Sequence, residues 1–195
     1  MRRAFGGLCL LALAVLAAPA MAQEKQTPSV TPPVAQAQAP AASGVRAEIL
    51  RQIGDAQEKL VALAEAMPAD KYGWRPGAGV RSTGEVFLHV AGGNYFLPTL
   101  WGVKPPEGVD VRGLEKQGGD KAKVIDTLKK SFDHARQAIQ SVPEADLEKA
   151  ARIFGQDGTN REAFMVVASH AHEHLGQAIA YARMNGVTPP WSAGG

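Results

Sequence analysis

The chain has 195 residues, with 21 basic and 19 acidic side chains and a formal net charge of +2. This near balance gives no electrostatic basis for binding nucleic acid, which requires a concentration of positive charge. Cys9 is the only cysteine, so the chain can form neither an internal disulfide nor a multi-cysteine zinc site.

The first 22 residues have the organisation of a secretory signal peptide. Arg2 and Arg3 form a charged start, residues 8–18 form an apolar run, and small residues precede a cleavage site after Ala22. The apolar run is shorter than the ~20 residues that cross a bilayer, so we expect no membrane span in the mature chain. The sequence therefore predicts a periplasmic or secreted protein. Cleavage would leave 19 basic against 19 acidic side chains and no cysteine.

Residues 23–43 are rich in Gln, Ala and Pro and lack the bulky apolar side chains that a core needs. Such a composition is typical of a disordered linker. Residues 44–195 then have a length that suits one folded domain.

Four segments of this domain have the apolar periodicity of amphipathic helices. The first runs from Val45 to Met67 and is stopped by Pro68. The second starts at Ser82, and Pro98 would bend or end it. The side chains expected to share the inward face of the second helix are Val86, His89, Phe96 and Leu100.

The third helix is expected from Asp120, as its N-cap, to Ser141. The fourth runs from Thr159 to Asn185, and Gly186 provides its C-terminal stop. The second and fourth helices each begin with a Ser or Thr that a Glu follows three residues later, which is the pattern of a capping box.

The connections show no alternating pattern typical of strands. Residues 103–119 form a Gly/Pro-rich connection, residues 143–150 a short acidic turn or helix, and residues 153–158 a loop. The tail at 189–191 is expected to pack back on the domain. The sequence therefore predicts an all-α fold, a four-helix bundle.

Two histidines replace apolar residues in the inward stripe of the fourth helix. His170 and His174 are four residues apart, so their rings lie on one face of a helix. Such a pair can hold one metal ion, and His89 on the inward face of the second helix could complete a three-nitrogen site if the helices pack antiparallel.

Other interpretations of these residues remain open at this point. His89 alone could be an ordinary hydrogen-bonded core histidine, and on a strand His170, His172 and His174 would all share one face. On a helix, His172 lies about 200° around the axis from His170 and should point to solvent or an edge. His134 is expected at the surface.

The chain resembles the DinB-like family of the DinB/YfiT metal-binding superfamily. The resemblance rests on the order of four parts: Trp74-Arg75-Pro76, residues 82–89 ending in His, the pattern His-x-x-x-His-x-Gly-Gln at 170–177, and the tail at 181–191. Together these parts span most of the predicted domain.

The resemblance implies a four-helix bundle of the DinB/YfiT type with a crossover connection. It implies a divalent metal, zinc or nickel, held by His89, His170 and His174. It further implies a metal-dependent hydrolase or transferase acting on a small molecule, in a superfamily whose members often form homodimers. The alternative is a non-catalytic metal-binding or partner-binding helical domain.

A metal-dependent reaction would also need a general base or an orienting group. The residues one turn from the expected ligands are Glu85 and Gln177. Glu85 is better explained as the partner of Ser82 in the capping box. Gln177 would support His174 or simply pack.

Overall fold

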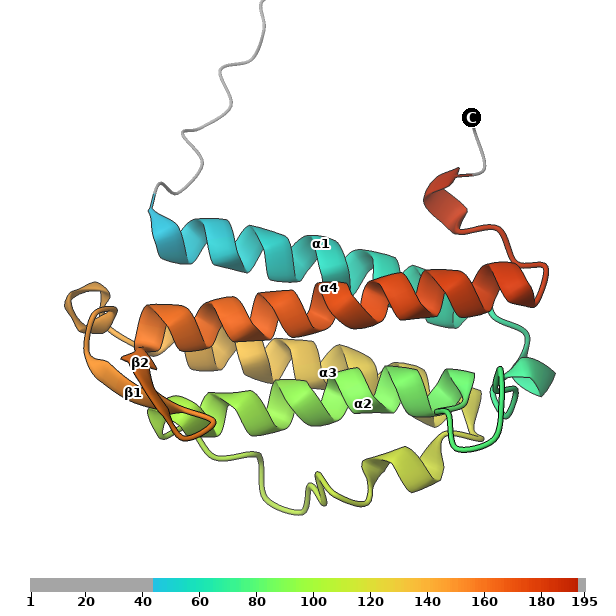
Figure 1. Cartoon of the computed structure of the whole chain (residues 1–195), viewed down its shortest axis with the longest axis horizontal. Coiled ribbons are helices and arrows are strands. Elements are labelled where there is room, and N and C mark those ends of the chain that lie inside the picture. Colours follow the sequence, from blue (N-terminus) through green and yellow to red (C-terminus); the bar gives the residue numbers. More distant parts are fainter. Residues whose placement is uncertain (1–43, 193–195) are drawn as a thin grey trace, which may run out of the picture. The chain divides into compact units, whose positions relative to one another are not determined.

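The computed structural model describes residues 44–192, which form a four-helix bundle (Figure 1). Its helices are α1 (Val45–Ala66), α2 (Thr83–Phe96), α3 (Lys121–Gln140) and α4 (Asn160–Met184). Short 3₁₀ helices lie between and after them: η1 (Ala69–Lys71), η2 (Leu97–Trp101), η3 (Leu114–Gln117), η4 (Glu144–Asp146) and η5 (Pro190–Ser192). The expected signal peptide (1–22) and linker (23–43) lie outside the described residues.

Three of the four predicted helix starts are confirmed by side-chain caps. Ser82 and Glu85 form a complete capping box at α2, and Thr159 and Glu162 form another at α4. The Asp120 side chain accepts a hydrogen bond from the Lys123 amide at the start of α3. These side chains satisfy amides that the first turn of a helix leaves without partners, so they set where each helix begins.

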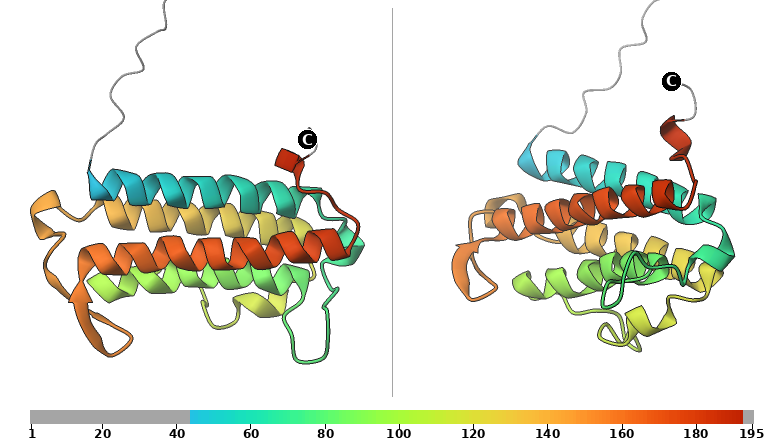
Figure 2. Two further views of the ribbon diagram at one scale, coloured as in Figure 1. Left: turned by 45° about the horizontal axis from the view of Figure 1, so that its top comes forward. Right: turned by 45° about the vertical axis from the view of Figure 1, so that its right-hand side comes forward.

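Each helix packs against two others, α1 and α2 both lying against α3 and α4, and the α1–α3 and α2–α4 pairs are antiparallel. The start of α3 lies against the end of α1, where Lys121 Nζ donates to the carbonyls of Glu65 and Met67. The end of α4 lies against the start of α2, where the Tyr181 hydroxyl donates to the Arg81 carbonyl. In Figure 1, α2 and α3 run the same way, so the connection between them must cross over along the bundle. Figures 1 and 2 show this crossover on the outer side of α2.

The core is built from apolar side chains of all four helices. Ile53, Leu60, Phe132 and Phe164 are completely buried, as is Leu128. Each such side chain contributes roughly 1.5–3 kcal/mol through removal of its surface from water. This core fixes the relative positions of α2 and α4, the two helices that carry the expected metal ligands. Within the described residues, no helix is both long and apolar enough to cross a membrane.

Two details of the predicted fold were wrong. The segment expected to be a turn and a loop contains an antiparallel hairpin of β1 (Ala150–Ile153) and β2 (Gln156–Thr159). Phe96, expected inward, is 48% exposed. It does share a face of α2 with His89, but at that level the face opens toward a cavity. The 3₁₀ helix η5 contacts α1, as expected for the tail.

Candidate metal centre

His89, His170 and His174 come together between α2 and α4. One ring nitrogen of each lies within 4.8 Å of those of the other two. The ring centroids are 5.2 Å apart for His89 and His170, 4.5 Å for His89 and His174, and 4.7 Å for His170 and His174. His174 is buried and the other two are half-buried. The antiparallel packing of the two helices produces this convergence.

The outer nitrogen of His89 is held by a carboxylate from the crossover. Nδ1 of His89 lies 2.8 Å from Oε1 of Glu115 in η3. Because a carboxylate only accepts, Nδ1 carries the proton and donates, so the lone pair of His89 is on Nε2. The other oxygen of Glu115 accepts from Nε of Arg81 at 2.9 Å, so both carboxylate oxygens are engaged.

The outer nitrogen of His174 is held by a chain of neutral groups. The Tyr181 hydroxyl donates to the Arg81 carbonyl at 3.2 Å and therefore accepts from Nε2 of Gln177 at 3.1 Å. This fixes the Gln177 amide so that its oxygen faces Nδ1 of His174 at 2.9 Å. Nδ1 of His174 is then the donor, and its lone pair is also on Nε2. Both supporting chains end at Arg81, one on its side chain and one on its carbonyl.

His170 has no such support. Its Nδ1 is buried with no hydrogen-bond partner among the described residues. Its Nε2 lies 3.4 Å from Nε2 of His89. The ring is positioned sterically instead, since a Cβ on Gly93 would lie 2.3 Å from Cε1 of His170. A larger residue at position 93 would therefore displace the ring.

A divalent cation fits these donors. Two nitrogens bound to one zinc ion lie ~3.3 Å apart, given Zn–N distances of ~2.05 Å and a tetrahedral angle, and the two Nε2 atoms of His89 and His170 are 3.4 Å apart. If Nε2 of His170 carries the proton, it donates to Nε2 of His89 and the lone pair on Nδ1 of His170 is buried without a donor. If Nδ1 carries the proton, the lone pairs of the two Nε2 atoms face one another. A cation between the rings would remove the repulsion of facing lone pairs. Imidazole nitrogen is a common ligand of both zinc and nickel.

The electrostatics of the site favour the neutral, ligand-competent imidazoles. Burial, with smaller contributions from the neighbouring His174 and His89, lowers the pKa of His170 to about 4. Burial also lowers the pKa of His89, although the hydrogen bond with Glu115 opposes this. Burial raises the pKa of Glu115, but the hydrogen bonds from Arg81 and His89 outweigh it and hold that pKa below its ordinary value. At neutral pH the site therefore has neutral rings of His89 and His170 and an ionised supporting carboxylate.

A model of the DinB superfamily matches residues 52–178, which include all three histidines. The chain belongs to the DinB superfamily. A DinB-like protein from Bacillus cereus has a similar crystal structure, with a TM-score of 0.64 and 18% identity over 73% of this chain and 93% of that one. A second DinB-like protein, from Bacillus subtilis, has a TM-score of 0.56 and 18% identity over 72% and 93%. No curated protein matches.

The other candidate residues named from the sequence of this DinB-superfamily chain lie outside the histidine cluster. Glu85 completes the capping box with Ser82 and pairs with Arg75 at 3.0 Å, which confirms its structural explanation. His172 lies at the α1–α4 edge, 3.1 Å from the Gln52 carbonyl and outside the cluster. His134 was expected at the surface but is half-buried, because its ring packs 5.4 Å from that of Tyr95 on α2.

Sequence reasoning missed Glu115, Arg81 and Tyr181 as supports of the histidines. Glu115 lies in a Gly/Pro-rich connection without periodicity, so no local pattern distinguishes it. One signal was available, because a metal-binding histidine usually donates its other N–H to an acceptor. That rule directs attention to carboxylates of the crossover, among them Glu107, Asp110 and Glu115.

A cavity of about 370 Å³ adjoins two of the three histidines. It lies between α2, the crossover and the hairpin turn. Its lining is Leu88, His89, Gly92, Gly93, Phe96, Leu97, Val111, Arg112, Glu115, Phe154 and His170. A small molecule in this space would be next to the histidine cluster of the DinB fold.

Proposed function

We propose that this chain is an exported member of the DinB superfamily that binds one divalent metal ion through His89, His170 and His174. We propose further that it is a metal-dependent hydrolase or transferase acting on a small molecule. The observation that carries the proposal is the orientation of His89 and His174, whose outer nitrogens both donate outward and leave lone pairs on the inner ones. His170 faces His89 at 3.4 Å beside the cavity.

Residues around the three histidines position them for a metal ion. Glu115 and Gln177 hold two imidazoles in the tautomer that binds a cation, and Gly93 leaves room for the third. When bound, a divalent ion supplies Lewis acidity toward water or toward a substrate oxygen or sulfur. The apolar walls of the cavity would exclude bulk water from a substrate placed next to the cluster.

The alternative, a metal-binding domain without catalysis, is favoured by one observation. Among the described residues that line the cavity, Glu115 is the only carboxylate, and both of its oxygens are already hydrogen-bonded. No carboxylate of this lining is therefore free to act as a general base. A group-transfer reaction in which the substrate is activated by the ion alone would not need one.

Metal analysis followed by an activity screen tests the proposal. The purified protein is expected to bind one Zn²⁺ or Ni²⁺ ion and to turn over members of an ester, amide or thiol-transfer panel. His174→Ala should abolish both, while His172→Ala, on the same helix but outside the cluster, should change neither. Full turnover by His174→Ala would rule out the metal-dependent reaction. Stoichiometric metal without turnover would favour the non-catalytic alternative.

Export is tested separately, by sequencing the N-terminus of protein recovered from the periplasm or medium. A mature chain beginning at Gln23 is the expected result. Recovery of the intact chain from the cytoplasm alone would contradict it.

A further inference from the structure

The cavity beside the histidines has an apolar wall contributed by three separate parts of the chain. Leu88, Phe96 and Leu97 come from α2 and η2, Val111 from the crossover, and Phe154 from the hairpin turn. The polar side chains of the lining are the two histidines, Glu115 and Arg112. A volume of about 370 Å³ lies within the ~300–1,000 Å³ range typical of small-molecule sites.

Phe154 occupies a backbone conformation that its side chain disfavours. It has a φ of 49°, and it forms a two-residue turn with Gly155, whose φ is 88°. Hairpin turns with two positive φ values favour Asn-Gly or Asp-Gly, because an aromatic residue in the left-handed region costs roughly 1–2 kcal/mol. Burial of the aromatic ring offsets little of this cost, since Phe154 remains 65% exposed.

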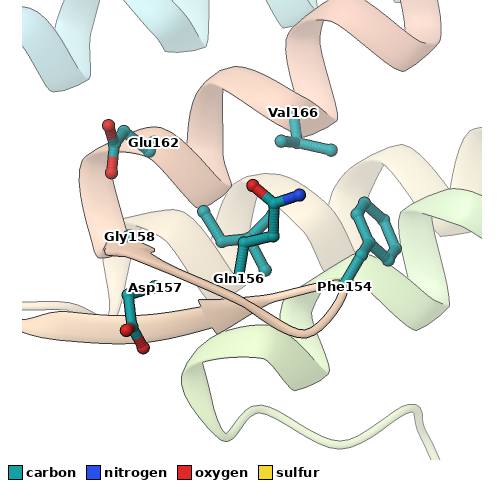
Figure 3. Close-up of a pocket in the computed structure, with 7 residues that line it drawn as sticks. Phe154, Gln156, Asp157, Gly158, Glu162 and Val166 are labelled. Atoms are coloured by element: carbon teal, nitrogen blue, oxygen red, sulfur yellow. The ribbon is translucent and has the colours of Figure 1, made fainter.

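The position of the ring suggests what the strain serves. In Figure 3 the Phe154 side chain stands up from the turn on the same side of the hairpin as Val166 of α4. Phe154 lines the cavity shown there and also the cavity beside His89 and His170. A strained, exposed aromatic residue at the mouth of a cavity is better explained by contact with a ligand than by stability of the turn.

Arg112 gives the same cavity an unmatched positive charge. No ion pair within residues 44–192 includes it. The nearby carboxylate of Glu115 does not balance it, because that carboxylate is engaged by Arg81 and His89. A guanidinium group presents several N–H donors in a planar fork that matches a carboxylate.

We propose that this cavity takes a small organic acid with an apolar body, whose carboxylate pairs with Arg112 and whose apolar part packs against Phe154 and the α2 wall. That this acid is the substrate rests on the function proposed above, because the cavity adjoins His89 and His170. Arg112 and Phe154 are thus assigned as specificity residues, one for charge and one for apolar surface.

Three probes separate the two contributions: hexanoate has both features, hexanol lacks the charge, and acetate lacks the apolar body. Calorimetry on the purified chain, Zn²⁺-loaded and EDTA-treated, should show hexanoate binding at least about tenfold more tightly than either other probe. Arg112→Gln should reduce hexanoate to the affinity of hexanol and leave hexanol unchanged. Lys116→Gln, an exposed cation of the same crossover outside the cavity lining, is the matched control and should change nothing.

Phe154→Asn gives a readout that a structural role would not produce. Asn is preferred in this turn, so the melting temperature should stay the same or rise, while hexanoate and hexanol should both bind several-fold more weakly. A fall in melting temperature with unchanged probe affinity would show that Phe154 serves the hairpin. Equal affinity of the wild-type chain for hexanoate and hexanol, or a preference that survives in Arg112→Gln, would overturn the charge assignment.

The two metal states separate this inference from the proposed function. A hexanoate preference in the EDTA-treated chain, lost in Arg112→Gln, supports the cavity assignment even if no Zn²⁺ binds. A preference that exists only with Zn²⁺ and persists in Arg112→Gln would mean that the carboxylate contacts the ion, which overturns the inference and leaves the metal site standing.

Discussion

His170 differs from His89 and His174 in how its ring is held. The other two rings each donate from Nδ1 to an oxygen of a residue that is itself hydrogen-bonded, at 2.8 and 2.9 Å. His170 has a buried Nδ1 without a partner in the described part of the chain, and its closest polar neighbour is another imidazole. Two of the proposed ligands are thus oriented in advance, whereas the third is confined by packing.

His89 and His174 are therefore preorganised for a metal ion, whereas the His170 ring can adjust to one. A metal ion would gain two ligands at little cost in ordering, because Glu115 and Gln177 already fix their tautomers. His170 would gain most from the ion, since its ring nitrogens are poorly satisfied without one. Substitutions that affect His170 and the other two histidines differently test this difference.

Removal of a ligand should have the largest effect on metal affinity. His170→Ala and His174→Ala should each weaken Zn²⁺ binding by more than the ~10–100-fold that loss of a supporting partner costs. In EDTA the two variants should diverge, because His174→Ala leaves the Gln177 amide oxygen without its donor, whereas His170→Ala removes an unsatisfied nitrogen. Calorimetric titration and urea unfolding measure the two quantities. Equal destabilisation of the two variants in EDTA would contradict this difference between His170 and His174.

Gly93→Ala should displace the His170 ring without contacting His89 or His174. Its Cβ would lie 2.3 Å from Cε1 and 2.7 Å from Nδ1 of His170, so the ring must move. We expect loss of tight Zn²⁺ binding and about 1–3 kcal/mol of destabilisation from overpacking. Gly92→Ala is the matched control, because its nearest neighbour would be 3.8 Å away, an ordinary contact. Tight Zn²⁺ binding by Gly93→Ala would show that the His170 ring is not confined as described.

The metal-free protein should lose stability as the pH falls from about 6.5 toward 4. Burial, with smaller contributions from His174 and His89, lowers the pKa of His170 from 6.5 to about 4, so in this window the unfolded chain binds the proton more readily than the folded one. The stability is complete above the unfolded pKa, and the loss reaches about 3 kcal/mol at the lower end. Urea unfolding in EDTA at several pH values measures it. His170→Ala should flatten the profile, and an unchanged slope would contradict the assignment.

Glu115→Ala should weaken metal binding less than loss of a ligand does, by about 10–100-fold. The His89 ring would keep its position on α2 but lose the acceptor that fixes its tautomer. Glu107→Gln, an exposed carboxylate in the same crossover, should have no effect on Zn²⁺ affinity. If both variants bind Zn²⁺ like the wild type, Glu115 does not support the site.

The helices were predictable because their caps and apolar stripes are local. Ser82 with Glu85, Thr159 with Glu162, and Asp120 mark starts that the structure reproduces. The convergence of the three histidines also followed from spacing and antiparallel packing, together with the family resemblance.

The hairpin and the supporting residues were not predictable in this way. Each strand has four residues without alternation, and the turn is Phe154-Gly155 rather than the Asn-Gly that signals a hairpin. Glu115 and Arg81 reach the site through tertiary structure, since the crossover returns along α2 to bring η3 beside His89. Similarly, helical periodicity placed Phe96 with His89 but could not show that this face opens to a cavity.

Anomalous scattering from a crystal grown with Zn²⁺ tests the central claim most directly. We predict a single strong peak between α2 and α4, about 2.1 Å from one nitrogen of each of His89, His170 and His174. The absence of a peak there at saturating Zn²⁺, or a peak bound only by His172 or His134, would contradict it.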